Sequence, residues 1–282
     1  MKTVEQYKKG VFLHPVTALK YLALTLAGFS CILPFVWVAL SSVKPDREIY
    51  SNSFGLPKVW VWSNYKDAWK GAQVATSFLN SIFYSFTSVA LLILVAAMAS
   101  YILARVWTSK ILYNFFALGI MIPIHAVIIP MLMILRRLGL VNTRLGIILA
   151  YTVAELSFSI FILVAFMKTI PKEIEEAAQI DGSSRLPTFF QIILPISKPG
   201  LATIGTFAFI NSWNDLLLAL VVTSGPKLST LNLACFNLRG LYVQHYGLIT
   251  AGLMIMMIPV IVIYIFFQEQ LVKGITAGAV KS

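Results

Sequence analysis

Residues 176–195 read EAAQIDGSSRLPTFFQIILP, a modestly polar stretch in a chain that is otherwise almost entirely apolar. Glu173, Glu175 and Glu176 predict the first turn of a short helix here, because negative charge is favoured at a helix N-terminus. This helix would carry a narrow apolar face of mostly small side chains, formed by Ile174, Ala177 and Ala178. The first half of the stretch is therefore predicted to be a short amphipathic helix.

The second half of the stretch predicts a bend and another short helix. Asp181-Gly182 indicates a helix end, with Gly182 in the left-handed conformation. Ser183 or Ser184 can cap the next helix, and Pro195 is expected to end it. Two short helices joined by a bend cannot cross a bilayer, so we expect this stretch to be a docking element at the membrane surface.

The same stretch holds a Glu-Ala-Ala triplet, a glycine, an isoleucine and a Leu-Pro pair at fixed spacing. These residues are Glu176, Ala177, Ala178, Gly182, Ile192, Leu194 and Pro195. At this full spacing the stretch resembles the cytoplasmic EAA loop of permease subunits of ATP-driven (ABC) importers. The triplet alone would be a weak signal, because such runs occur in many ordinary helices. The resemblance implies that these residues, together with Asp181, couple the membrane domain to ATPase subunits.

Shorter motifs elsewhere resemble the carbohydrate branch of these permeases, close to the maltose-type permease. They are Ser42-x-Lys44-Pro45, Asn64-Tyr65, Asn80-Ser81, Ser212-Trp213-Asn214-Asp215 and the segment KGITAGAV at 273–280. The resemblance therefore extends over essentially the whole chain. It implies three kinds of partner: a second homologous permease subunit, a dimer of ATPase subunits and an extracytoplasmic solute-binding protein. It also implies that this chain is not an enzyme and binds no cofactor, with ATP used by the partner ATPase.

The composition independently indicates a membrane protein. The 282 residues are 59% hydrophobic and only 12% charged, against the roughly 25% charged residues of soluble domains. The net charge of +11 comes from basic residues scattered singly through loops, without the dense basic stripe of nucleic-acid-binding proteins. Cys31 and Cys235 lie in or beside apolar segments and form no CxxC pair, so neither a metal site nor a disulfide is expected.

Six apolar segments are long enough to cross a bilayer, which takes roughly twenty residues. They are residues 19–43, 78–104, 111–135, 145–167, 200–223 and 247–268. Pro34, Pro123 and Pro130 fall inside spans and are expected to kink the helices rather than break them. We therefore expect a single all-α polytopic membrane domain over 1–282, with six transmembrane helices and a helix-turn-helix coupling loop at 171–195.

The distribution of charge does not fix the orientation of these spans, because Lys and Arg are divided almost evenly between the two sides. The resemblance implies that the coupling loop and both termini are cytoplasmic, in a cell (inner) membrane. Loops 44–77, 136–144 and 224–246 are then external. The aromatic residues of 44–77 suit a belt at the membrane surface, with direct substrate contact as the alternative. By resemblance, loop 224–246 probes the sugar cleft of the binding protein and the tail 273–282 inserts toward the ATPase dimer.

Two acidic residues, Asp215 and Glu155, fall inside predicted spans, where ionisable side chains are costly and commonly face a cavity or a partner. Asp215 stands in a cluster that we expect to line the translocation pathway: Asn211, Trp213, Asn214 and Asp215. An interhelical hydrogen bond is the alternative role for Asp215. Glu155 fits a structural hydrogen bond and a pathway role equally well. His125, beside Pro123, is expected to make a helix–helix hydrogen bond rather than to act as a ligand.

These observations favour a permease subunit of an ATP-driven, binding-protein-dependent importer of a sugar or oligosaccharide. No Gly-Lys dipeptide occurs, so a G-x-x-x-x-G-K-[ST] phosphate loop is absent and the chain does not hydrolyse ATP by that route. A stand-alone secondary transporter or channel for a polar solute is the alternative. It would predict inverted repeats, and the two halves of the chain show none. A structural membrane scaffold would leave the spaced motif unexplained.

Overall fold

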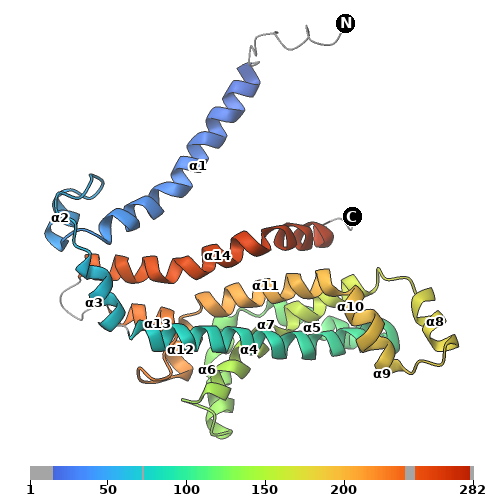
Figure 1. The fold of residues 1–282 in the computed structure, drawn as a ribbon. Coiled ribbons are helices and arrows are strands. Elements are labelled where there is room, and N and C mark those ends of the chain that lie inside the picture. The colour runs from blue at the N-terminus through green and yellow to red at the C-terminus, as the bar shows by residue number, and fades with distance from the viewer. Residues whose placement is uncertain (1–14, 72, 239–244, 280–282) are drawn as a thin grey trace, which may run out of the picture.

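The computed structural model describes residues 15–71, 73–238 and 245–279, and within these ranges the chain is helical and holds no strand (Figure 1). The predicted all-α fold is therefore confirmed. The long helices are α1 (Pro15–Ser41), α4 (Val74–Tyr101), α7 (Arg144–Met167), α11 (Lys198–Asn214) and α14 (Tyr246–Ala279). Segments of intermediate length are α3 (Ser63–Gly71), α5 (Lys110–Met121), α6 (Ile124–Arg137) and α8 (Glu173–Ile180). The shortest are α2 (Asp46–Ser51), η1 (Ile102–Val106), α9 (Arg185–Pro187), η2 (Thr188–Ile193), α10 (Leu194–Ile196), α12 (Leu217–Val222) and α13 (Leu231–Phe236).

Three segments that the sequence singled out fall wholly or partly outside the described residues. They are the polar segment before Pro15, the Arg239-Gly240 part of loop 224–246, and the end of the tail 273–282.

Four helices of the described chain are long and apolar enough to cross a membrane. They cover Val16–Ser41, Val74–Val106, Arg144–Met167 and Tyr246–Phe266. Two further pairs of helices, each bent at a short break, raise the number to as many as six if each pair is one span. The outer surfaces of these helices carry large exposed apolar side chains, such as Phe29 on α1 at 70% exposed. Such a surface suits lipid, since water contact would cost roughly 25 cal/mol for each Å² of it.

The third predicted span is broken rather than kinked. Residues 111–135 were expected to form one helix, but α5 ends at Met121 and α6 begins at Ile124, with a bend of 107° between them. Pro123 lacks the amide hydrogen that would continue the helix, and it stands directly before the first residue of α6 with a β-region backbone. Pro130, by contrast, lies inside α6. The start of α6, at Ile124 and His125, lines the same cavity as the break between α11 and α12.

The fifth predicted span, 200–223, is also divided. Helix α11 ends at Asn214, residues 215–216 are extended or irregular, and α12 begins at Leu217. The six predicted spans treated 200–223 as one helix, although the mostly polar residues 211–215 stand directly before the break and the apolar residues 216–222 follow it. The break leaves the last carbonyl groups of α11 and the first amide groups of α12 in need of partners at mid-chain.

The centre of the bundle is formed by α4, α7 and α11, and α4 and α7 make the largest contact between two helices. The buried face of α4 is built largely from small residues, including Ser81, Ser85, Ser88, Ala96 and Ala97. Small side chains let helix backbones approach closely, which is the usual basis of packing between membrane helices. Figure 1 shows α8–α10 at one end of this bundle and α2, α3 and α13 at the other.

The loop 44–77, at the α2–α3 end, is held together by the buried cation Lys44. The Lys44 side chain is fully buried, and its Nζ donates to the backbone carbonyls of Asn52 at 2.8 Å and Gly55 at 2.6 Å. The side-chain amide of Asn64 donates to the carbonyl of Lys44 at 2.9 Å. This loop is therefore an ordered cap with aromatic rings on its outside, among them the exposed and stacked Trp60 and Trp62.

Candidate coupling surface and translocation cavity

The bend of the EAA stretch is a glycine-terminated helix end. Gly182 has φ of +80°, as predicted from the sequence. Its amide donates to the carbonyl of Gln179 at 3.0 Å, and the Ser183 amide donates to the carbonyl of Ala178 at 2.9 Å. These two bonds form a Schellman motif, which satisfies carbonyl groups that the end of α8 leaves unpaired. The second helical segment then runs through Pro195 and ends at Ile196, one residue beyond the predicted end.

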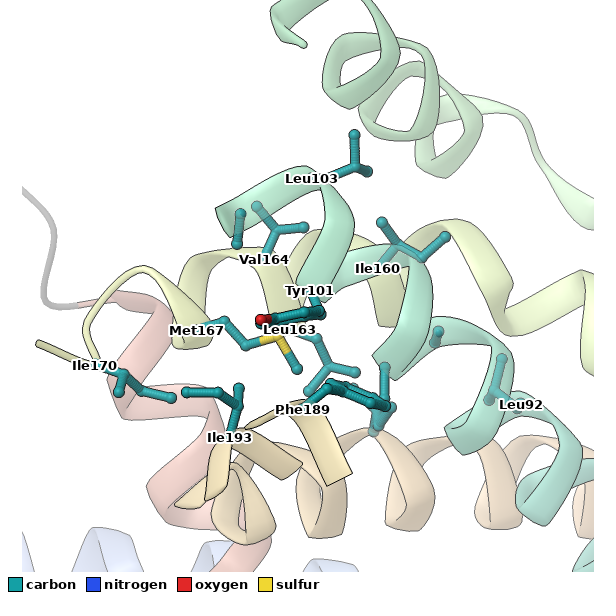
Figure 2. Close-up of a cluster of buried hydrophobic side chains, with 14 of the residues drawn as sticks. Leu92, Tyr101, Leu103, Ile160, Leu163, Val164, Met167, Ile170, Phe189 and Ile193 are labelled. Atoms are coloured by element: carbon teal, nitrogen blue, oxygen red, sulfur yellow. The ribbon is translucent and has the colours of Figure 1, made fainter. Parts of the chain in front are cut away.

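One face of the helix pair is anchored in a cluster of buried side chains that we call the coupling-end cluster. Figure 2 shows its central members, among them Leu92, Tyr101, Leu163, Met167, Phe189 and Ile193. Phe189 and Ile193 of η2 are 2% and 0% exposed, and the Phe189 ring lies 5.1 Å from that of Tyr101. Burial of each such side chain contributes roughly 1.5–3 kcal/mol. The second short helix is thus fastened to α4 and α7.

The predicted coupling residues divide between this anchored face and the opposite one. Ala178 is buried, and Ile174, Ile192 and Leu194 pack against the coupling-end cluster. The exposed members are Glu176, Ala177, Asp181, Gly182 and Pro195. Large apolar side chains extend the same outer surface: Ile180 is 87%, Leu186 64% and Phe190 46% exposed. We call these exposed residues the outer coupling face.

Sequence reasoning missed Arg105, which joins this region to the bundle. The guanidinium of Arg105 reaches from η1 to the end of α7 and to Glu175 of α8. In the sequence Arg105 is a single basic residue at the end of an apolar run, a pattern typical of a membrane-interface residue. The sequence holds no acidic residue close to Arg105, and only this lack could have suggested that its partner lies on another helix.

A cavity of about 500 Å³ lies beside the break between α11 and α12. Its lining combines polar and apolar side chains: Ile124, His125, Tyr151, Ala154, Glu155, Asn211, Ser212, Asn214, Asp215 and Leu216–Leu218. The structure thus brings together Glu155, Asn211, Asn214 and Asp215, four of the five residues singled out from the sequence for the pathway. The fifth, Trp213, is 3% exposed and stacks on Phe209 at 5.6 Å in a separate core cluster, so it does not line the cavity.

Asp215 supplies the partners for the amide groups at the start of α12, and the side-chain amide of Asn232 donates to the carbonyl of Trp213 at the end of α11 at 2.8 Å. Oδ1 of Asp215 accepts the amide of Leu218 at 3.2 Å, and its Oδ2 accepts the amide of Ala219 at 3.0 Å. A carboxylate at the N-terminus of a helix also gains from the helix dipole. Tyr151 of α7 donates its hydroxyl to the same Oδ2 at 3.0 Å. Asp215 therefore both lines the cavity and makes the interhelical bond considered as its alternative role.

Glu155 and His125 also line the cavity, but unlike Asp215 neither accepts a backbone amide of α12 in the described part of the chain. Oε1 of Glu155 accepts the side-chain amide of Asn211 at 2.9 Å. His125 stands in the first turn of α6, next to the break at Pro123, and lines the cavity. The expected helix–helix hydrogen bond of His125 is not found among the described residues. The bend between α5 and α6 instead directs the imidazole toward the open space.

Comparison with known proteins identifies the family. Residues 93–277 match the family described as binding-protein-dependent transport system inner membrane component. The diacetylchitobiose uptake system permease protein NgcG of Streptomyces coelicolor is 33% identical over 93% of this chain and 88% of its own length. The trehalose transport system permease protein SugB of Mycobacterium tuberculosis is also 33% identical, over 91% of this chain and 95% of its own length.

A solved structure shares the fold. A bacterial ABC transporter involved in import of the acidic polysaccharide alginate contains a chain with a TM-score of 0.81, at 22% identity, covering 90% of this chain and 96% of that one. The similarity therefore extends over nearly all of the helices of both chains. On these grounds the chain belongs to the family of binding-protein-dependent transport system inner membrane components.

Proposed function

We propose that this chain carries a sugar or oligosaccharide through the cell membrane as one permease subunit of a binding-protein-dependent ABC importer. The observation that carries this proposal is the helix pair α8–α10, which is anchored on one side and apolar and exposed on the other. The relatives belong to uptake systems for diacetylchitobiose and for trehalose, which supports a carbohydrate as the solute.

The outer coupling face is the proposed docking site for an ATPase subunit. Ile180, Leu186 and Phe190 offer apolar side chains for a groove in the partner. The carboxylates of Glu176 and Asp181 flank them and offer acceptors for basic side chains. An aromatic anchor within a partly charged rim is the usual composition of a protein–protein contact that carries binding energy. ATP is bound and hydrolysed by that partner, and this chain holds no cofactor of its own.

The cavity beside the α11–α12 break is the proposed part of the translocation pathway. Its volume of about 500 Å³ falls within the roughly 300–1,000 Å³ typical of small-molecule sites. Glu155, Asn211 and Asn214 present hydrogen-bonding atoms beside the apolar side chains of Ile124 and Leu217. A sugar has both hydroxyl groups and apolar ring faces, so this mixture suits it.

The remaining assembly follows from the same proposal. A second, homologous permease subunit completes the pathway, and a solute-binding protein delivers the sugar at the α2–α3 end. Both chain termini and the coupling loop 171–195 are then cytoplasmic, and loops 44–77, 136–144 and 224–246 are external. Figure 1 supports this arrangement, because the coupling helices and the α2–α3 cap lie at opposite ends of the bundle.

The docking proposal is tested by co-purification in detergent from the native membrane, with the ATPase chain that accompanies this one identified by mass spectrometry. Phe190→Asp and Leu186→Asp place a charge on the outer coupling face and should abolish recovery of the ATPase. Leu56→Asp makes the same change at a residue 74% exposed on the α2–α3 cap, so it is the matched control and should retain the ATPase. Equal recovery in all three variants would refute the docking site. Uptake of labelled disaccharides by the reconstituted complex then identifies the solute.

A further inference from the structure

Arg105 lies where three elements meet. It belongs to η1, the five-residue π-helix that follows α4, and its side chain is only 4% exposed. Its Nη2 donates to the carbonyl of Met167, the last residue of α7, and to that of Ile170 in the following turn. Its Nε lies 3.2 Å from Oε1 of Glu175 on α8, whose side chain is 13% exposed. One guanidinium, carried on η1 at the end of α4, therefore contacts the end of α7 and the coupling helix α8.

The chemistry of arginine explains why this residue type fits the position. The last carbonyl groups of a helix have no partner within it, and the helix dipole gives them a partial negative charge. The guanidinium is planar, permanently charged and carries donors pointing in different directions. It can therefore bind the end of α7 with one edge and the Glu175 carboxylate with another. A lysine has a single charged nitrogen and cannot hold both groups with comparable geometry.

The contact with Glu175 differs from the contacts with α7. The Arg105 Nε and Glu175 Oε1 are close enough for an ion pair but are not aligned for a hydrogen bond. Tyr101 lies at the other carboxylate oxygen, Oε2, at 3.5 Å. The contacts with Met167 and Ile170 are hydrogen bonds, whereas the link to α8 is mainly electrostatic and depends less on angle.

We propose that Arg105 is a positioning residue that ties the coupling helix α8 to the ends of α4 and α7. The inference rests on the proposed function, because it takes α8 to be the element that the ATPase displaces. When α8 moves, the charge of Glu175 pulls the guanidinium with it, and the guanidinium in turn displaces the ends of α4 and α7. Helix α7 carries Tyr151 and Glu155 at the cavity, so its displacement reaches the pathway directly.

The test uses the assembled complex in detergent and a reporter that needs no knowledge of the solute. Asn214, exposed in the cavity lining, is replaced by cysteine in a Cys31→Ser background. The rate of maleimide labelling is compared with and without a non-hydrolysable ATP analogue. Arg105→Gln should reduce the analogue-induced change in rate by about tenfold, within the range typical of coupling between sites. The complex should still contain the ATPase and still hydrolyse ATP.

Matched variants separate this role from a general effect on folding. Glu175→Gln changes a side chain on a short surface helix and should reduce the response in the same direction as Arg105→Gln. Arg105→Lys should give an intermediate response. Lys110→Gln and Glu173→Gln make the same changes of charge at nearby positions outside this contact and should respond as the unmodified protein does.

A full response in both Arg105→Gln and Glu175→Gln would overturn the inference. Loss of the ATPase from the Glu175→Gln complex would overturn it as well, because Glu175 would then hold the partner rather than orient α8. Failure of the docking proposal has a different signature. In that case Phe190→Asp binds the ATPase normally. If only the positioning role of Arg105 is wrong, Phe190→Asp still fails to bind the ATPase, and Arg105→Gln shows the full analogue-induced change in labelling rate.

Discussion

The hydroxyl of Tyr151 donates a hydrogen bond of 3.0 Å to Oδ2 of Asp215, and this bond links α7 to the break between α11 and α12. Tyr151 is 3% exposed, so most of its side chain is packed within the bundle while its hydroxyl stands at the cavity wall. Asp215 also accepts two amide groups from the first turn of α12. A single carboxylate thus holds the backbone break open and fixes its position against α7, which gives the cavity its wall.

We predict that Asp215→Ala lowers both transport and stability. The change removes a helix-capping carboxylate, which costs about 1–2 kcal/mol, and leaves the Tyr151 hydroxyl without this acceptor, which adds at most roughly 1–3 kcal/mol. Solute uptake and the thermal unfolding temperature in detergent measure the two effects. Glu155→Ala should lower uptake less and leave the unfolding temperature nearly unchanged, because Glu155 bonds only one side chain among the described residues, that of Asn211. A reversed order of uptake would mean that Glu155 is the principal pathway residue.

The parts of this structure that sequence could predict are those determined by local chemistry. The α8 helix, its glycine-terminated end and the apolar character of the long helices follow from residue types within a few positions of each other. The conformation of Gly182 is the clearest case, because glycine adopts a positive φ more readily than any other residue.

Other features depend on how helices are rotated against each other, which no single stretch encodes. The sequence singled out Glu155 and Asp215 but could not predict their partners. Glu155 on α7 accepts a hydrogen bond from Asn211 on α11, and Asp215, after α11, accepts one from Tyr151 on α7. Trp213 was expected to line the pathway from its place in a motif, but helix rotation turns its ring into the core. The break at Pro123 was missed because proline is compatible with either a kink or a break, and the surrounding helices decide which occurs.

We predict that Lys44→Met loosens the cap formed by loop 44–77. The Lys44 ammonium is fully buried and is the donor for the carbonyls of Asn52 and Gly55. Removing it leaves these part-buried carbonyls without their donor, at a cost of at most about 1–3 kcal/mol for each. Limited proteolysis should cut the loop faster, and stimulation of ATP hydrolysis by the binding protein should fall. Lys66→Met, at an exposed position in the same loop, is the control and should resist proteolysis as the unmodified protein does.

We predict opposite labelling of the two ends of the bundle in intact cells. Lys66→Cys and Ser184→Cys introduce exposed thiols on the α2–α3 cap and on the coupling loop. A membrane-impermeant maleimide should label Lys66→Cys directly and Ser184→Cys only after permeabilisation. Labelling of both from the same side would contradict the proposed topology.

The native Cys235 should not interfere with that measurement. Burial raises the pKa of the Cys235 thiol to about 12. Because the thiolate is the reactive form, a raised pKa keeps this cysteine protonated and inert below that pH. Its labelling should therefore stay small between about pH 7 and pH 9, because only a minute fraction of the thiol is ionised there. Rapid labelling of Cys235 in the folded protein would show that its surroundings in loop 224–246 are open.

The sharpest prediction concerns Gly182. A side chain at its φ of +80° meets no neighbouring atom within 4 Å, so the penalty of substitution is confined to the backbone, at roughly 1–2 kcal/mol. That is too little to unfold the protein, but it acts on the bend that orients the outer coupling face. Gly182→Val should therefore leave membrane insertion intact while weakening recovery of the ATPase and solute-stimulated ATP hydrolysis.

The chain offers a closely matched control for this variant. Gly139 also has a positive φ, of +69°, and open space where a side chain would be added, but it lies in the turn between α6 and α7. Gly139→Val carries the same kind of backbone strain away from the coupling helices. If both variants lost the ATPase equally, the loss would come from general destabilisation. Loss of the ATPase in Gly182→Val alone would locate the effect at the bend of the coupling helices. Both variants carry the same kind of backbone strain, but only the strain at Gly182 changes the direction of Phe190 and Leu186.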